Sequence, residues 1–483
     1  MKDGVINKYI HKYQALSAPL KASVWFAVCN ILQKGISMIT VPVFTRILTT
    51  AQFGVFSVYQ SWSSIVAIFA TLNLFYGVFN NGMVKFRDNR DGFTSSLQVL
   101  TTVVTTVVFI IYLIFHNFWN SVFGLSTLFV MVMFVELYFT PAYSFWAARQ
   151  RFEYKYKLLV IVTLLQSVLT PLIGIIAVLS TTYKAEARVI SYVLVEVCIG
   201  FIFYLYNLRK GKQGFVRKYW KFALAFNIPL IPHYLSQTVL QQSDRIMISA
   251  LVGKDKAAIY SVAYNISSLM ALVTNAINNS FIPYTYDQIS KRKFSQLRST
   301  TNALTSLVAI LSVLVMLFGP EVVKIFAPPA YYEAIYIIPP VSASIFFIFL
   351  YPIFANVEFF FEENKFVMVA SVLGAVLNIL LNLVFIPKFG YLAAGYTTLV
   401  CYMVFSGAHY GFMKIVIRNK MPEAQPYNVN FIFALSIMEV LFVFISLLLY
   451  RNIVVRYAVL VLIVIGILVN RRRLMKLFES LKK

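Results

Sequence analysis

The sequence predicts an all-α polytopic membrane protein of about fourteen transmembrane helices, arranged as two six-helix pseudo-repeats plus an appended helix pair. The chain of 483 residues is 60% hydrophobic and 12% charged, whereas soluble proteins are about 25% charged. Apolar runs of about 17–25 residues recur along the whole length, enough to cross ~30 Å of hydrocarbon as helices. The period-two alternation that is typical of membrane barrels is absent, so we expect helices only.

Each predicted span is an apolar run that ends at charged, proline-containing or glycine-containing connections. The predicted spans are 22–45, 54–79, 95–115, 121–148, 157–180, 187–208, 222–250, 257–286, 299–319, 334–360, 366–386, 390–414, 428–449 and 453–470. The first run follows about twenty polar, Lys-bearing residues and has no small-residue cleavage site, so we expect a retained span and not a signal peptide.

A helical pair at 22–62 recurs at 235–267. Thr45-Arg46-Ile47-Leu48 aligns with Asp244-Arg245-Ile246-Met247, and an aromatic-Ser-Val helix start follows in both copies. Such a repeat indicates duplicated halves, as in many membrane carriers. An even number of spans in each half makes the two repeats parallel in the membrane.

The formal charge of +24 comes from basic residues that lie mostly between apolar runs on one side of the predicted topology. The positive-inside rule therefore places both termini in the cytoplasm and explains the charge without a nucleic-acid partner. The most basic connection separates the halves. The predicted domains are an N-terminal half at 1–208, a cytoplasmic linker at 209–221, a C-terminal half at 222–418, and the appended helices with a basic cytoplasmic tail at 419–483.

Motifs of enzyme chemistry are missing from the sequence. We find no glycine-rich phosphate loop, no metal-ligand spacing and no nucleophile with a plausible base. We therefore expect neither an enzyme nor a bound cofactor, and no attached ATPase domain. A coupling ion, H⁺ or Na⁺, would then supply the energy.

One passage carries more specific information than periodicity. Residues 377–398 (LNILLNLVFIPKFGYLAAGYTT) contain two Asn four residues apart, then Ile-Pro-basic-aromatic-Gly, then small residues with Thr. Together with Arg46…Phe53-Gly54 and residues 327–334 (APPAYYEA), this passage resembles the Wzx-type flippases of the multidrug/oligosaccharidyl-lipid/polysaccharide exporter superfamily. Asn378 and Asn382 share one helix face and are expected to be mainly architectural.

The resemblance implies translocation of undecaprenyl-pyrophosphate-linked oligosaccharide across the cytoplasmic membrane, for capsule, exopolysaccharide or O-antigen-type assembly. It further implies a monomer that works by alternating access among membrane lipids, with a glycan polymerase and co-polymerase as partners. The alternatives are a flippase for teichoic-acid chains or lipid II, and a multidrug/cation antiporter.

Basic residues in the first helix of each half are the candidate substrate-binding cations. Lys34 lies twelve residues into its span, about 18 Å at ~1.5 Å per residue and so near the midplane, and it shares a face with Asn30 and Ser37. It would either line a cavity that receives an anionic head group or be neutralised by an intramembrane carboxylate. Arg46 and Arg245 would either clasp phosphate or acidic sugar or anchor the interface, Arg245 with Asp244 as a local pair.

Spans seven and eight carry polar stripes that lipid tails could not solvate. The predicted lining consists of Asn30, His233, Gln237, Gln241, Asn265, Asn275 and Asn279. The stripes indicate either a hydrophilic cleft for sugar hydroxyls or hydrogen bonding between helices. Pro229 and Pro232 give span seven a place to bend.

Three acidic residues within spans are candidates for ion coupling: Glu136, Glu196 and Asp244. An intramembrane carboxylate can bind a proton in one state and release it in the other. Glu136 or Glu196 could instead pair with Lys34. Glu358, near the inner boundary, is expected to be solvated.

Overall fold

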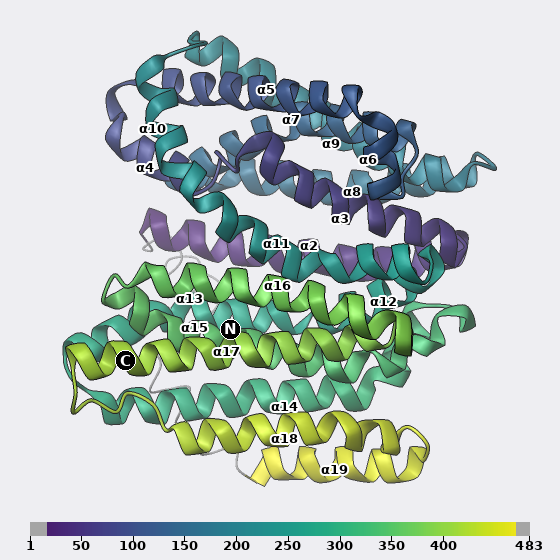
Figure 1. Cartoon of the computed structure of the whole chain (residues 1–483), viewed down its shortest axis with the longest axis vertical. Helices are drawn as coiled ribbons and strands as arrows, with labels where there is room; N and C mark the ends of the chain where they lie inside the picture. The colour runs from purple at the N-terminus through teal and green to yellow at the C-terminus, as the bar shows by residue number, and fades with distance from the viewer. Residues whose placement is uncertain (1–16, 470–483) are drawn as a thin grey trace, which may run out of the picture. The chain divides into compact units, whose positions relative to one another are not determined.

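The computed structural model describes residues 17–469, without the side chains of residues 364–367 and 467. Every regular element in this part of the chain is a helix, as predicted. The chain divides into two compact units, Met1–Leu235 and Ser236–Lys483, and Figure 1 shows the helices of each. The predicted basic tail lies outside the described residues.

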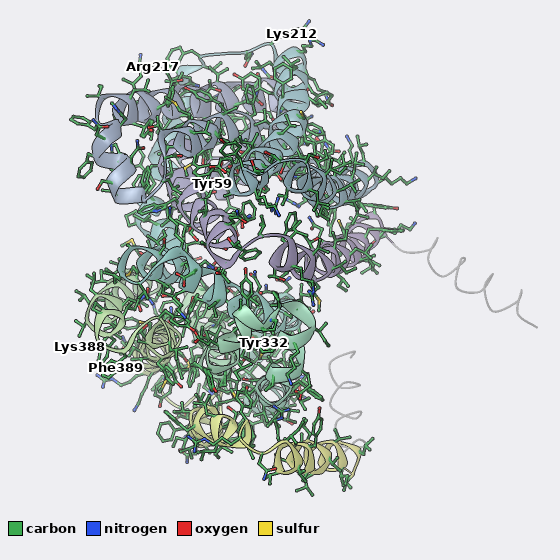
Figure 2. All side chains as sticks on the ribbon, turned by 90° about the vertical axis from the view of Figure 1, so that its right-hand side faces the viewer. Tyr59, Lys212, Arg217, Tyr332, Lys388 and Phe389 are labelled. Carbon is green, nitrogen blue, oxygen red and sulfur yellow. The ribbon has the colours of Figure 1, made fainter. Side chains whose placement is uncertain are left out.

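The first unit is a bundle of long apolar helices with short helices at its ends. Its elements are α2 (Ala18–Ile47), α3 (Thr50–Thr71), α4 (Gly77–Lys85), η1 (Arg87–Asn89), α5 (Arg90–Ile114), α6 (His116–Phe123), α7 (Thr127–Phe152), α8 (Tyr156–Leu179), α9 (Lys184–Gly211), α10 (Arg217–Asn227) and η2 (Ile228–Leu230). Figure 2 shows Lys212 and Arg217, which flank the connection from α9 to α10, at one end of this unit.

The second unit begins within α11 and contains the remaining helices. These are α11 (Ile231–Leu251), α12 (Lys254–Ser267), α13 (Met270–Ser290), α14 (Phe294–Phe326), η3 (Pro329–Tyr336), α15 (Ile338–Phe360), α16 (Asn364–Phe389), α17 (Ala393–Lys420), α18 (Val429–Leu449) and α19 (Ile453–Val469). Each of the fourteen predicted spans therefore has a helical counterpart.

Capping hydrogen bonds and residues with positive φ set several helix ends in the first unit. Thr49 closes a capping box with Gln52 at the start of α3, which satisfies two N–H groups reciprocally. The predicted span 54–79 is too long, because Leu72 and Asn73 adopt positive φ and end α3 at Thr71. Likewise Gly124, with a φ of +61°, divides the predicted span 121–148 into α6 and α7.

The two polar spans are broken, as the prolines of span seven predicted. Span seven consists of α10, the short η2 and α11, with Pro229 inside η2. Span eight consists of α12 and α13, which meet at 45°. Within residues 17–469, eleven helices are long and apolar enough to cross a membrane, or twelve if α12 and α13 form one span. The exact count of fourteen stays a prediction, since α10–α11 is too polar and α19 too short for this criterion.

Helix α15 lies at the centre of the second unit. It is apolar on all sides, and 83% of the residues in its most apolar 18-residue stretch are buried. This burial is expected for a helix that is surrounded by others. Glu358, at the C-terminal end of α15, is fully buried and its Oε1 lies 2.9 Å from Nδ1 of His409 on α17. The expectation that Glu358 is solvated was wrong, because this end of α15 is covered by α17.

The appended helices dock on α14 through polar contacts at one end and apolar contacts along their length. Tyr450, after α18, donates a 2.5 Å hydrogen bond to the carbonyl of Met316. The buried Arg456 of α19 forms an ion pair with Glu321 of α14, and Leu460 packs against Val313 and Leu317. Figure 1 shows α18 and α19 side by side.

Replacing Arg456 should loosen this helix pair. An arginine partner removed from a buried ion pair costs about 3–5 kcal/mol, and about 1 kcal/mol shifts the melting midpoint of a large domain by ~2–4 °C. We expect Arg456→Ala to lower the midpoint of the detergent-purified protein by several degrees and to expose α18–α19 to protease first. The matched control is Arg451→Ala, because Arg451 is exposed and forms no salt bridge within the described residues. Equal midpoints for the two variants would contradict the docking role of Arg456.

Candidate functional site

The most extensive polar network in the second unit surrounds Asp244 of α11. This side chain is 1% exposed. One carboxylate oxygen accepts hydrogen bonds from the hydroxyls of Tyr260 (2.5 Å) and Thr398 (2.6 Å). The other accepts from the amides of Asn378 (3.2 Å) and Asn382 (2.8 Å). Asp244 thereby links α11, α12, α16 and α17.

The two asparagines of the signature passage are held in place by further contacts. Ser243 donates to the side-chain oxygen of Asn378 at 2.6 Å, and Thr397 donates to that of Asn382 at 2.5 Å. Both asparagines are completely buried. Their amide groups therefore have protein partners, and the interpretation of this passage as architecture agrees with the geometry.

The signature passage at 377–398 also contacts the resembling segment at 327–334. Tyr391, from the turn between α16 and α17, donates to Glu333 of η3, and Lys256 of α12 donates to the same oxygen at 2.8 Å. The hydrogen bonds from Lys256 and Tyr391 hold the pKa of Glu333 below its ordinary range. The sequence resemblance thus marks two surface segments that contact each other directly.

In the first unit, the two candidate carboxylates within spans, Glu136 and Glu196, accept hydrogen bonds from uncharged side chains. Glu136 of α7 is 7% exposed and accepts hydrogen bonds from Tyr59 (2.7 Å), Ser63 (3.3 Å) and Tyr192 (3.4 Å). Tyr59, which Figure 2 labels on α3, comes from the helix that faces α7. Glu196 of α9 is half-buried, and both of its oxygens accept from the amide of Gln166 at 2.7 Å. The alternative pairing of either glutamate with Lys34 is not seen in this unit.

A buried cation that was not among the predicted site residues lies near the start of predicted span six. Arg188 of α9 is 6% exposed, and its guanidinium stacks on the rings of Phe44 (4.0 Å) and Phe56 (3.9 Å). Such cation–π contacts partly replace lost hydration.

The three predicted substrate-binding cations differ in exposure. Lys34 and Arg46 are exposed on α2, and the guanidinium of Arg46 donates to the carbonyl of Pro42 at 2.8 Å. Arg245 is buried, donates to Gln241 and Gln242, and stacks on Tyr264 at 4.4 Å. Asp244 and Arg245 form no salt bridge, because each side chain has partners on other residues.

The residues of the predicted polar lining also differ in exposure. Asn30, Gln241, Asn275 and Asn279 are exposed, whereas His233, Gln237 and Asn265 are half-buried. Gln237 donates to Ser371 of α16 at 3.2 Å, so part of the stripe on α11 serves contacts between helices. The function of these residues stays a prediction.

Long apolar helices, hydrogen-bonded intramembrane carboxylates and a polar span that breaks at η2 define a multi-pass membrane protein. The sequence profile of the polysaccharide biosynthesis protein family matches residues 20–288, more than half of the chain, and the MatE profile matches residues 229–384. The chain belongs to the polysaccharide biosynthesis protein family, and the predicted membership in the exporter superfamily is confirmed.

One curated relative and several solved structures are similar to the chain. An Lsg locus protein of Haemophilus influenzae is 26% identical over 206 residues, which are 40% of this chain and 50% of that protein. The chain therefore spans about half the length of this relative in the match. A structure of the lipid II flippase MurJ in an inward closed conformation has a TM-score of 0.61 at 13% identity, covering 93% of this chain and 99% of MurJ.

The fold is also that of multidrug transporters. An inward-facing multidrug resistance MATE family transporter of the MOP superfamily has a TM-score of 0.61 at 13% identity, with 84% of this chain and 100% of that chain covered. A MOP superfamily transporter from Pyrococcus furiosus has a TM-score of 0.57 at 13% identity, covering 83% of this chain and 97% of its own. At such identities the likeness shows the fold.

The Asp244 network should be essential for folding of the second unit. In Asp244→Asn, the new amide faces four donors and leaves at least one buried group without an acceptor, at about 1–3 kcal/mol for each. We expect a lower melting midpoint and a lower yield of monodisperse protein. Asp287→Asn is the matched control, since Asp287 lies at the half-exposed end of α13 beside Lys291. An Asp244→Asn variant as stable as the control would show that the network contributes little.

Proposed function

We propose that this protein translocates a lipid-linked oligosaccharide, attached to undecaprenyl pyrophosphate, from the inner to the outer leaflet of the cytoplasmic membrane. The observation that carries the proposal is Lys34, a cation near the middle of α2 that is exposed from the first unit and has no salt bridge with a described residue. The buried Glu136 and the half-buried Glu196 of this unit have other partners. Membership in the polysaccharide biosynthesis protein family supports an oligosaccharide as the cargo.

A lipid-facing position is unfavourable for the charged Lys34 side chain. A charged side chain at the bilayer centre costs about 2.5–3.5 kcal/mol on insertion scales and more in simulations. An exposed Lys34 therefore faces a water-filled space during at least part of the transport cycle. The exposed Asn30 and Ser37 on the same side of α2 supply hydrogen-bonding groups beside it.

A fixed cation in that space would balance the charge of the cargo. A bare pyrophosphate in hydrocarbon would be prohibitively unstable, whereas an ammonium group in a water-filled cleft stabilises it. The glycan would cross beside polar side chains while the polyprenyl chain stays in the bilayer. Exposed Arg46, at the end of the same helix, would extend the cationic surface toward the outer boundary.

Among the three candidates for ion coupling, Glu196 is best suited to bind a proton reversibly. Asp244 and Glu136 accept four and three hydrogen bonds from described residues, so protonation would displace a donor. Glu196 accepts from Gln166 alone and is half-buried. We infer that Glu196 couples transport to the proton gradient.

Removing the cation at position 34 should strongly reduce transport. Lys34→Ala should reduce translocation of lipid-linked oligosaccharide in proteoliposomes at least about tenfold, because a contact between two charges near a protein surface, where the effective dielectric constant is about 20, contributes more than about 1.4 kcal/mol. Lys34→Arg should retain most of the wild-type translocation. The assay is accessibility of the glycan to an external sugar-modifying reagent. Lys157→Ala, at the exposed start of α8, is the control. A wild-type translocation rate for Lys34→Ala at equal protein levels would contradict the role of Lys34 as the substrate-binding cation.

The coupling role of Glu196 predicts a specific phenotype. A proton uncoupler should slow the wild-type protein, and Glu196→Gln should transport slowly with or without uncoupler, since glutamine carries no exchangeable charge. Glu153→Gln serves as the control, because Glu153 lies after the end of α7 in contact with Arg149 and Lys155. A Glu196→Gln protein that still responds to the uncoupler like wild type would exclude this residue as the coupling site.

A further inference from the structure

The second unit contains a basic pocket that the proposed transport does not use. The pocket, about 780 Å³, lies between the start of α14, the end of α17 and the start of α18. Arg298, Lys414 and Arg418 line it, and no acidic side chain does. None of the three cations forms a salt bridge with a residue that the structure describes. A pocket of this size is in the range of small-molecule sites, and its charge selects an anion.

Backbone geometry adds to the positive potential of the pocket. Val429 and Asn430, the first residues of the 21-residue helix α18, line it. The first N–H groups of a helix lack intrahelical acceptors, and the helix dipole favours an anion there. The N-cap side chain of Asn428 accepts only the N–H of Phe431. Three cations beside a helix N-terminus form a suitable site for a phosphate group.

The surroundings of the pocket indicate that its ligand also has an apolar part. Met413 and Ile417 form an apolar wall between the cations. Beyond the pocket, Ile415 is 47% exposed on α17 and Phe433 is 64% exposed on α18. Phe433 follows the pocket-lining Val429 by about one helical turn and therefore shares its face of α18. An exposed apolar side chain beside a cationic pocket matches an acyl chain below its head group.

We propose that this pocket binds the phosphate head group of an anionic phospholipid, with the acyl chains along the exposed faces of α17 and α18. Basic pockets at helix ends on the cytoplasmic side are typical places for such head groups, and the predicted topology puts this end of the helices there. The site is separate from Lys34 and from the path proposed for the oligosaccharide. A bound lipid would hold the connection from α17 to α18, and with it the appended helix pair, in place.

The test is native mass spectrometry of the full-length protein released from bilayers of phosphatidylglycerol and phosphatidylethanolamine. The triple variant Arg298→Gln, Lys414→Gln, Arg418→Gln should retain at least about tenfold less phosphatidylglycerol than wild type. The control removes three exposed cations of α10, as Arg217→Gln, Lys218→Gln and Lys221→Gln, and should change retention less than about twofold. Equal retention by the triple variant and wild type would overturn the proposal.

Two further arms keep the outcome decisive. Lys414→Gln alone changes an exposed side chain and should fold normally, so a reduced phosphatidylglycerol retention in this variant supports the site even if the triple variant is unstable. Undecaprenyl pyrophosphate is the competing probe. If it displaces phosphatidylglycerol from both wild type and the α10 control, and its own retention falls in the triple variant, the pocket belongs to the cargo and the phospholipid assignment is wrong.

Discussion

A carboxylate inside a membrane helix bundle has no water to solvate it, so the protein must supply every hydrogen-bond donor. Asp244 meets this requirement with two hydroxyls and two amides from three neighbouring helices. The four donor groups lie on α12, α16 and α17, and all four hydrogen bonds can form only in one alignment of these helices. The network therefore fixes the register of the three helices against α11. Asn378 and Asn382 of the signature passage therefore serve to solvate the charge of Asp244. The apolar core of the second unit packs around helices that this network holds in register.

The first unit meets the same constraint with different chemistry. Thr45 of α2 aligns with Asp244, so the equivalent helix exit has no carboxylate to solvate. Instead, the fifth residue of α9 is Arg188, stacked between Phe44 and Phe56, whereas the fifth residue of α17 is Thr397, within the Asp244 network. The first unit therefore has a buried cation on α9 and a neutral residue on α2, whereas the second unit has a buried anion on α11 and a neutral residue on α17. If the two units are the predicted repeats, they carry buried charges of opposite sign on different helices.

Lys34 differs from these charges in its surroundings. Arg188, Glu136, Asp244 and Arg456 all have partners within their own units, whereas Lys34 is exposed on α2 and forms no salt bridge with a described residue. Because the four partnered groups are already held by the protein, we propose Lys34, and not one of them, as the cation that meets the cargo.

The sequence by itself determined the membrane class, the helical fold, the duplicated plan and the approximate place of each helix, because apolar runs of bilayer length leave no other structure that satisfies the backbone. It also identified the signature residues, since the spacing of Asn378 and Asn382 puts both on one helix face. Only the tertiary structure decided which polar residues face each other: Asp244 with the two asparagines, Glu358 with His409, and Arg188 with two phenylalanines. Periodicity gives the direction of a side chain around its own helix, but its partner depends on how helices far apart in sequence rotate and approach one another, and on backbone breaks such as that at Leu72.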